Sequence, residues 1–269
     1  MGSLTNFFYK REIKQFLNTA PVPILYPEKR LILLWNAKAG CTFSIKWMFA
    51  QMKLLEKATK YHHWIHIYRT EVYYKSRQYQ KGIKSFIKEP DSFTAIKIVS
   101  DPFKRAYRSY IHACTHGYED DKLSHFLQRE INNGKRFSFR EFVHYLKSVN
   151  INKCNIHHKM QTSDLERKNI IKIIKIINLE YSLREIPLFE NANNLNNIDL
   201  QEMRKSPHNH PKYRAYKFMG DVVMNEIYQE SKLKVPEYQQ FYDEEIEEII
   251  SEVYREDFER YNFELKIRR

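Results

Sequence analysis

A short turn of small residues carries the side chains best suited to chemistry, and it reads Ala37-Lys38-Ala39-Gly40-Cys41-Thr42. The apolar run at residues 31–35 precedes it and is typical of a strand buried on both faces. Apolar residues at helical spacing follow it, namely Ile45, Met48, Phe49, Met52 and Leu55. The first N–H groups of a helix lack backbone partners, and Lys38 and Thr42 would add a cation and a donor. The pattern predicts an anion-binding turn, with an ordinary strand-to-helix turn and a solvated lysine as the alternative.

The glycines restrict the kind of anion that this turn could bind. The chain has six of them, at Gly2, Gly40, Gly82, Gly117, Gly134 and Gly220. No two are spaced as GxxxxGK[ST] or GxGxxG requires. The sequence therefore disfavours an ordinary ATP or GTP site and a dinucleotide-binding site.

A second strand that leads directly into a helix is expected at residues 93–110. The segment Phe-Thr-Ala-Ile-Lys-Ile-Val at residues 93–99 is typical of a buried strand. It continues as Ser100-Asp101-Pro102-Phe103-Lys104-Arg105-Ala106-Tyr107-Arg108-Ser109-Tyr110. Pro102 suits the first turn of a helix, because the N–H that proline lacks has no partner there.

Together, the two segments resemble the phosphate-binding motifs of sulfotransferases that use 3′-phosphoadenosine 5′-phosphosulfate (PAPS), most closely those of the carbohydrate-type branch. In that family the 5′-phosphosulfate loop reads Pro-Lys-x-Gly-Cys/Ser-Thr, and the 3′-phosphate motif reads Val-Arg-Asp-Pro-Phe-x-Arg-Leu-x-Ser-x-Tyr. Residues 157–161, 173–180 and 252–258 are more weakly similar to later segments of the family. The resemblance implies an α/β fold with a central, mostly parallel sheet flanked by helices, that is, the P-loop-like sulfotransferase fold.

Three positions depart from the family motifs. Ala37 stands where the family usually has proline, Ser100 stands at the family's arginine, and Arg108 stands at the family's serine. Exchange of the last two keeps one guanidinium and one hydroxyl for the 3′-phosphate. Ser109 is a second candidate for the hydroxyl, and loss of the 3′-phosphate site is the alternative interpretation.

The resemblance also implies an activity, namely transfer of a sulfuryl group from PAPS to an acceptor hydroxyl without a metal. Lys38 would be catalytic by neutralising charge on the leaving phosphate, and a histidine would act as general base, with His63 and His66 as candidates. We prefer His66, because Arg69 three residues later could bind an anionic acceptor. The branch favours a carbohydrate or another alcohol as acceptor. The residues expected to bind the donor are Lys38, Ala39, Gly40, Cys41, Thr42, Phe43, Ser100, Arg108 and Ser109.

Further helices are expected at residues 3–17, 68–86 and 244–261, and the last of these has an apolar stripe at helical spacing. Ser138 and Glu141 form the pattern of a capping box that opens another helix. The second half of the isoleucine-rich residues 169–178 is expected to form a buried strand.

The composition predicts one basic domain over residues 1–269. Hydrophobic residues make up 42% of the chain, and its formal net charge is +12, which favours polyanionic partners. The three cysteines show neither a disulfide framework nor a zinc-site spacing. No apolar run approaches the ~20 residues that span a bilayer. With no signal-peptide core near residue 1, we expect a cytoplasmic protein, and the sequence does not indicate its oligomeric state.

Two other classes of protein stay open. A different P-loop-like phosphotransferase or kinase would need the Walker motif that is missing here. A basic nucleic-acid-binding protein would fit the net charge of +12. No helix-turn-helix, zinc-finger or RNA-recognition pattern supports that class, so we expect no nucleic-acid partner.

Overall fold

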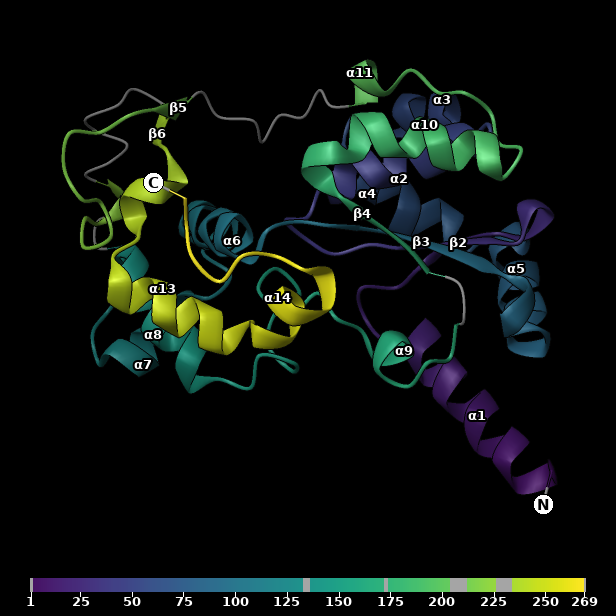
Figure 1. The fold of residues 1–269 in the computed structure, drawn as a ribbon, viewed down its shortest axis with the longest axis horizontal. Coiled ribbons are helices and arrows are strands. Elements are labelled where there is room, and N and C mark those ends of the chain that lie inside the picture. The colour runs from purple at the N-terminus through teal and green to yellow at the C-terminus, as the bar shows by residue number, and fades with distance from the viewer. Residues whose placement is uncertain (1, 133–135, 172–173, 204–211, 226–233, 269) are drawn as a thin grey trace. The chain divides into compact units, whose positions relative to one another are not determined.

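The computed structural model describes residues 2–132, 136–171, 174–203, 212–225 and 234–268 (Figure 1). The chain divides into two compact units. The first comprises Met1–Ser100 and Thr162–Ser206, and the second comprises Asp101–Gln161 and Pro207–Arg269. The chain thus enters the second unit directly after the second predicted strand. A single domain over residues 1–269 stays a prediction.

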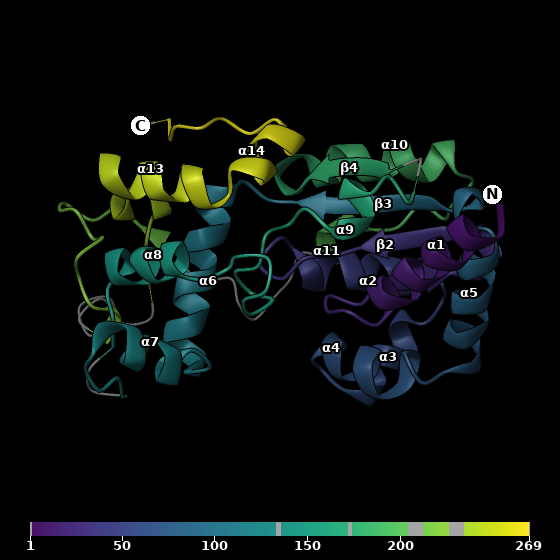
Figure 2. The same ribbon diagram turned by 90° about the horizontal axis from the view of Figure 1, so that it is seen from below.

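The first unit is built on a sheet that has four strands among the described residues, in the order β1-β2-β3-β4. Figure 2 shows β2, β3 and β4 side by side. The strands β2 and β3 run parallel, with Leu33 opposite Ile96, and β3 and β4 are also parallel. Only β1 is antiparallel to its neighbour. An α/β fold with a mostly parallel sheet is therefore confirmed. The strands are β1 Ile24–Tyr26, β2 Leu31–Leu34, β3 Thr94–Val99 and β4 Ile174–Asn178.

Helices cover both faces of this sheet, which explains the apolar sequences of β2 and β3. Figures 1 and 2 show α2 Cys41–Gln51 and α10 Ser182–Ala192 on one face, and α1 Gly2–Leu17 and α9 Asp164–Arg167 on the other. All four residues of β2 are buried. The prediction that the strand at residues 174–178 is buried was wrong. Among the strands of the described residues, β4 pairs only with β3, and four of its five residues are partly or fully exposed.

The helix expected at residues 68–86 is interrupted. A short helix ends at Tyr68 and continues as a π-helical turn, and α5 begins only at Arg77. The Ser76 hydroxyl fixes the new start by accepting a hydrogen bond from Tyr79 N–H at 3.1 Å. The remaining elements of the first unit are η1 Pro27–Lys29, α3 Leu55–Tyr61, α4 Ile65–Tyr68, η2 Arg69–Tyr73, α5 Arg77–Lys88, η3 Pro90–Ser92, η4 Leu179–Tyr181 and α11 Leu200–Met203.

The second unit is mainly helical, with an aromatic core that includes Phe103, Tyr110, Phe142 and Phe241. The predicted capping box is confirmed: Glu141 N–H donates to Ser138 Oγ at 3.2 Å, and Ser138 N–H donates to Glu141 Oε2 at 2.8 Å. The helix expected at residues 244–261 divides at Tyr254. The elements are α6 Pro102–His116, α7 Asp120–Leu127, α8 Phe139–Ser148, β5 Lys212–Tyr213, β6 Val235–Pro236, η5 Tyr238–Phe241, α13 Glu244–Val253 and α14 Arg255–Tyr261.

Candidate functional site

The predicted anion-binding turn joins β2 to α2 in the first unit. Lys38 and Gly40 both adopt left-handed backbone conformations, with φ of 64° and 76°. Gly40 is also the N-cap of α2, and a Cβ atom there would lie 2.5 Å from Leu179 Cδ1. A side chain at position 40 is therefore opposed both by backbone strain and by a steric clash.

The N-terminus of α2 presents backbone donors. No side chain caps this helix, and its first turn contains no acidic residue. The first helical hydrogen bond runs from Ser44 N–H to Gly40 O, at 2.9 Å. The N–H groups of residues 41–43 lie before this bond and therefore have no partner within the helix. The side chains of Ala39 and Phe43 are buried, whereas Lys38 is partly exposed. Ala39 and Phe43 could therefore contribute only backbone groups to a ligand.

The structure brings His66 to this turn. Its Nε2 atom lies 3.2 Å from Thr42 Oγ1 and 3.8 Å from Cys41 Sγ. His63, the other candidate base, is exposed and stacks on His62 with ring centroids 4.2 Å apart. The geometry therefore favours His66 over His63 as a base for chemistry at the turn.

Arg69 lies buried close to the same turn. Its guanidinium carbon is 4.2 Å from the centroid of the Trp35 ring, and the residue is only 8% exposed. Burial lowers the pKa of Arg69, and the nearby Tyr74 and Cys41 oppose this shift. The sequence indicated that Arg69 could bind an anionic acceptor, but it did not predict that this residue is buried.

Ser100 lies at the end of the sheet where the Lys38 turn lies. It follows the last residue of β3, which is parallel to β2, and the carboxyl ends of parallel neighbours meet at one edge. Ser100 is buried, at 3% exposure. Its hydroxyl could therefore contact only a ligand that is bound directly at this edge of the sheet.

In the second unit, Arg108 lies on α6 among other cations. Burial lowers the pKa of Lys104, and Arg108 and Lys212 lower it further while Asp101 opposes them. Burial and Arg108 likewise lower the pKa of Lys212. Asp101 caps α6 by accepting a hydrogen bond from Lys104 N–H at 3.0 Å. An anion would relieve the repulsion among the three cations.

Sequence reasoning missed Lys104 and Lys212 as members of this cluster. Lys104 stands four residues before Arg108 on one helix, which places both on one face and could have indicated it. Lys212 comes from β5, and no local pattern connects it to α6. Ser109 is fully buried in the second unit, and this burial argues against its predicted contact with phosphate.

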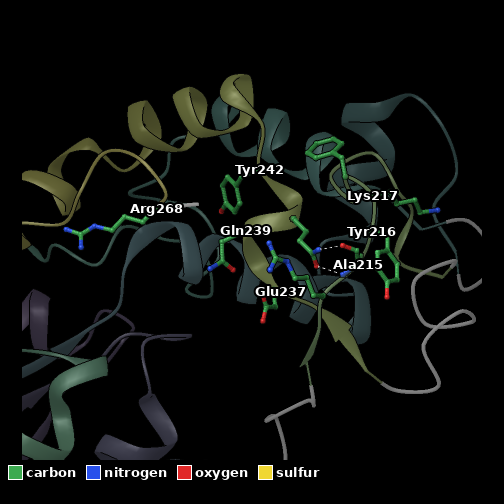
Figure 3. A pocket seen from close by; sticks show the side chains of 10 residues that line it. Ala215, Tyr216, Lys217, Glu237, Gln239, Tyr242 and Arg268 are labelled. Carbon is green, nitrogen blue, oxygen red and sulfur yellow. Dashed lines mark hydrogen bonds between the residues drawn. The ribbon is translucent and has the colours of Figure 1, made fainter.

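A surface pocket of the second unit contains none of the predicted site residues (Figure 3). Gln240 shapes it by accepting a hydrogen bond from Ala215 N–H at 2.8 Å. Arg214, Lys217 and Glu237 contribute charges to its lining. The lining contains no histidine, cysteine, serine or threonine, and we assign the pocket no chemistry.

No protein-family model, curated protein or solved structure matches the chain. Within the described residues, no group of three or more His, Cys, Asp or Glu side chains is placed to hold a metal ion. None of the described helices has both the length and the apolar character needed to cross a membrane. A functional assignment must therefore be argued from the site residues themselves.

Proposed function

We propose that the chain is a PAPS-dependent sulfotransferase with a P-loop-like sulfotransferase fold. The observation that carries the proposal is the turn between β2 and α2, which combines an uncapped helix N-terminus with left-handed Lys38 and Gly40. A helix start of this kind suits a phosphate group. The absence of the second glycine of a Walker motif disfavours a nucleoside triphosphate as the preferred ligand.

Each group at the turn would have a distinct role toward the donor. The N–H groups of residues 41–43 and the Thr42 hydroxyl would bind the 5′-phosphate. Lys38 would neutralise the charge that develops on this phosphate as its bond to sulfur breaks. Arg108 and Ser100 stay the candidates for the 3′-phosphate, and Lys104 and Lys212 would add positive charge near Arg108.

His66 would serve the acceptor. In the reaction, the acceptor oxygen bonds to sulfur, the bond between sulfur and the phosphate oxygen breaks, and 3′-phosphoadenosine 5′-phosphate (PAP) leaves. His66 would take the proton of the acceptor hydroxyl. Its 3.2 Å contact with Thr42 Oγ1 supports this role, because Thr42 belongs to the donor-binding turn. A carbohydrate or another alcohol is the proposed acceptor.

Calorimetric titration with PAP tests the proposal. We expect the wild-type chain to bind PAP in preference to ATP with Mg²⁺, and Lys38→Ala to abolish turnover of labelled PAPS. Arg108→Ala should weaken PAP binding by about 1.5–3 kcal/mol, which is typical for loss of a charge-assisted contact. Preference for ATP with Mg²⁺ would indicate a kinase instead, and unchanged PAP affinity of Arg108→Ala would refute the exchanged pair.

A matched pair of glycine variants separates the turn from general backbone strain. Gly40 and Gly117 both have positive φ, at 76° and 66°, but Gly117 ends α6 instead of opening α2. Backbone strain should cost each alanine variant about 1–2 kcal/mol of folding stability, and the clash with Leu179 should add to this cost in Gly40→Ala. Only Gly40→Ala should also weaken PAP binding. Equal PAP affinity in the two variants would show that the turn does not take part in PAP binding.

A further inference from the structure

Helix α5 carries a straight row of exposed cations along one face. The row consists of Arg77, Lys81, Lys84 and Lys88, which are spaced at i, i+4, i+7 and i+11. At about 100° per residue, this spacing places all four side chains within an arc of about 60° and along about 16 Å of the helix. No acidic residue occurs in α5. We call these four residues the basic row.

The opposite face of α5 is packed against the sheet. Tyr79 and Phe86 lie on that face and are buried, with 3% and 0% exposure. Gly82 lies between them, and a Cβ atom there would be 2.9 Å from Pro27 Cγ and 3.1 Å from Leu25 Cβ. The helix is therefore fixed closely on β1 and η1, and the basic row points away from the sheet into solvent.

The charge of the basic row is largely not neutralised. Lys88 Nζ lies 3.0 Å from Glu89 Oε1, but the same carboxylate also pairs with Arg30 at 3.0 Å. The other three cations of the row form no ion pair within the described part of the chain. Cations three and four residues apart on a helix repel one another. An external negative surface would relieve this repulsion.

Helix α1 adds positive charge beside α5. The two helices pack against each other within the first unit (Figures 1 and 2). The described side chains of α1 include three exposed cations, Lys10, Arg11 and Lys14. None of the three has an ion-pair partner among the residues that the structure describes. The basic row is therefore part of a wider basic region of this unit.

The kind of side chain in the basic row indicates the kind of polyanion that it fits. Both aromatic residues of α5 are buried, so its exposed face offers no ring on which a nucleobase could stack. Three of the four cations are lysines, which lack the bidentate geometry by which arginine reads base edges. A lipid surface requires only that positive charge reach a plane, and the side chains of a narrow, straight row can reach a plane together.

We propose that the basic row is a docking surface for an anionic lipid bilayer, such as one that contains phosphatidylserine. The apolar residues of α5 are buried or partly buried, so the contact would be electrostatic and reversible, without insertion into the hydrocarbon. This inference goes beyond the proposed sulfotransferase activity and does not depend on it.

The test measures binding of the full chain to vesicles by co-sedimentation. Vesicles of phosphatidylcholine alone are compared with vesicles of phosphatidylcholine mixed with phosphatidylserine. We expect binding only to the mixed vesicles, and weaker binding as salt screens the charges. The double variant Lys81→Gln with Lys84→Gln should lower the partition coefficient roughly 10- to 30-fold, because each lysine near an anionic surface contributes roughly fivefold. Glutamine and lysine have similar helix propensities, so α5 should stay folded.

A matched double variant is the control for net charge. Lys53→Gln with Lys57→Gln removes two exposed lysines of the same unit that lie outside α5. This variant should bind the mixed vesicles like the wild-type chain. Both double variants should keep the PAP affinity of the wild type, because α5 contains no residue of the proposed donor site.

Three outcomes would overturn the inference. The first is a wild-type chain that does not bind the mixed vesicles, or that binds phosphatidylcholine alone equally well. The second is an equal loss of vesicle binding in the two double variants, which would assign the binding to net charge instead of the basic row. The third is a variant of the row that loses affinity for a short DNA duplex but not for vesicles, which would make the row a nucleic-acid contact. Failure of PAP to bind would refute only the sulfotransferase proposal.

Discussion

At the scale of single residues, the contact between Thr42 and His66 connects the helix start to a titratable ring. Thr42 is the second residue of α2, and His66 lies on α4, so the 3.2 Å contact between Oγ1 and Nε2 joins two elements. A general base must lie within hydrogen-bond reach of the proton that it accepts. His66 satisfies this condition for a hydroxyl held at the turn.

The two candidate histidines can be separated by mutation. His66→Ala should lower turnover by roughly 10²- to 10⁴-fold, the usual contribution of general acid–base catalysis. His63→Ala should change turnover little, because His63 is exposed and contacts His62 instead of the turn. The measurement is the rate of transfer from labelled PAPS, with PAP affinity as the control. A larger loss in His63→Ala would reverse the assignment.

The sequence predicts the local part of this site and not the part that depends on packing. The Lys38 turn could be located because small residues, an apolar run and helical spacing all lie within one segment. The contact between Thr42 and His66 depends on how α4 folds back, which residue spacing does not encode. The burial of Arg69 between Trp35 and Tyr74 has the same origin.

At the scale of elements, a similar limit applies. The strands β2 and β3, the helix starts at Cys41 and Pro102 and the capping box of α8 follow from local patterns. The three-residue strand β1, in contrast, pairs antiparallel with β2, and no local pattern marks so short a strand. The exposure of β4 was missed because an edge position is a property of the whole sheet.

One element carries a charge that its apolar surroundings would normally exclude. Lys97 lies in the middle of β3 with 1% exposure, and its ammonium group pairs with the Glu166 carboxylate. Glu166 Oε2 also accepts hydrogen bonds from Ser163 N–H at 2.8 Å and from Ser163 Oγ at 2.7 Å, at the start of α9. This pair fastens α9 to the sheet that positions the Lys38 turn.

Burial alone would raise the pKa of Glu166, but Lys97 and the hydrogen bonds from Ser163 outweigh it and lower the pKa below its usual value. The carboxylate therefore adds stability above its unfolded-state pKa, and this stability is lost as the pH falls through the lowered folded-state pKa. Lys97→Met should cost about 3–5 kcal/mol at about pH 7, because it leaves a buried carboxylate unpaired.

In Lys97→Met, the pH dependence due to Glu166 should also reverse, since an unpaired buried carboxylate has a raised pKa and is stabilised by protonation. Urea unfolding between about pH 7 and pH 4 measures both effects. The double variant Lys97→Met with Glu166→Gln is the control and should recover part of the stability and lose this pH dependence. A Lys97→Met chain as stable as the wild type would show that the pair does not fasten α9.

At the scale of the whole molecule, the net charge of +12 on 269 residues raises a question that no single residue answers. A chain this basic attracts any polyanion, and such binding weakens steeply with salt because counterions are released. Attraction of this kind needs no particular lysine. The proposed site, in contrast, binds the 5′-phosphate of one small nucleotide through Lys38 and the N-terminus of α2.

Lys38→Ala therefore separates the proposed enzyme from a basic nucleic-acid-binding protein. We expect PAP affinity to fall by about tenfold or more in this variant and to persist at about 0.15 M salt in the wild type. Binding of a short DNA duplex should be weak at that salt concentration, with the steep salt dependence of non-specific contact. Duplex binding is measured by fluorescence titration of a labelled duplex, and PAP binding is measured by calorimetry on the same samples. The opposite result would be a chain that does not bind PAP but binds the duplex tightly, with the same affinity in the wild type and in Lys38→Ala. That result would mean that the basic surface, and not the turn, carries the function.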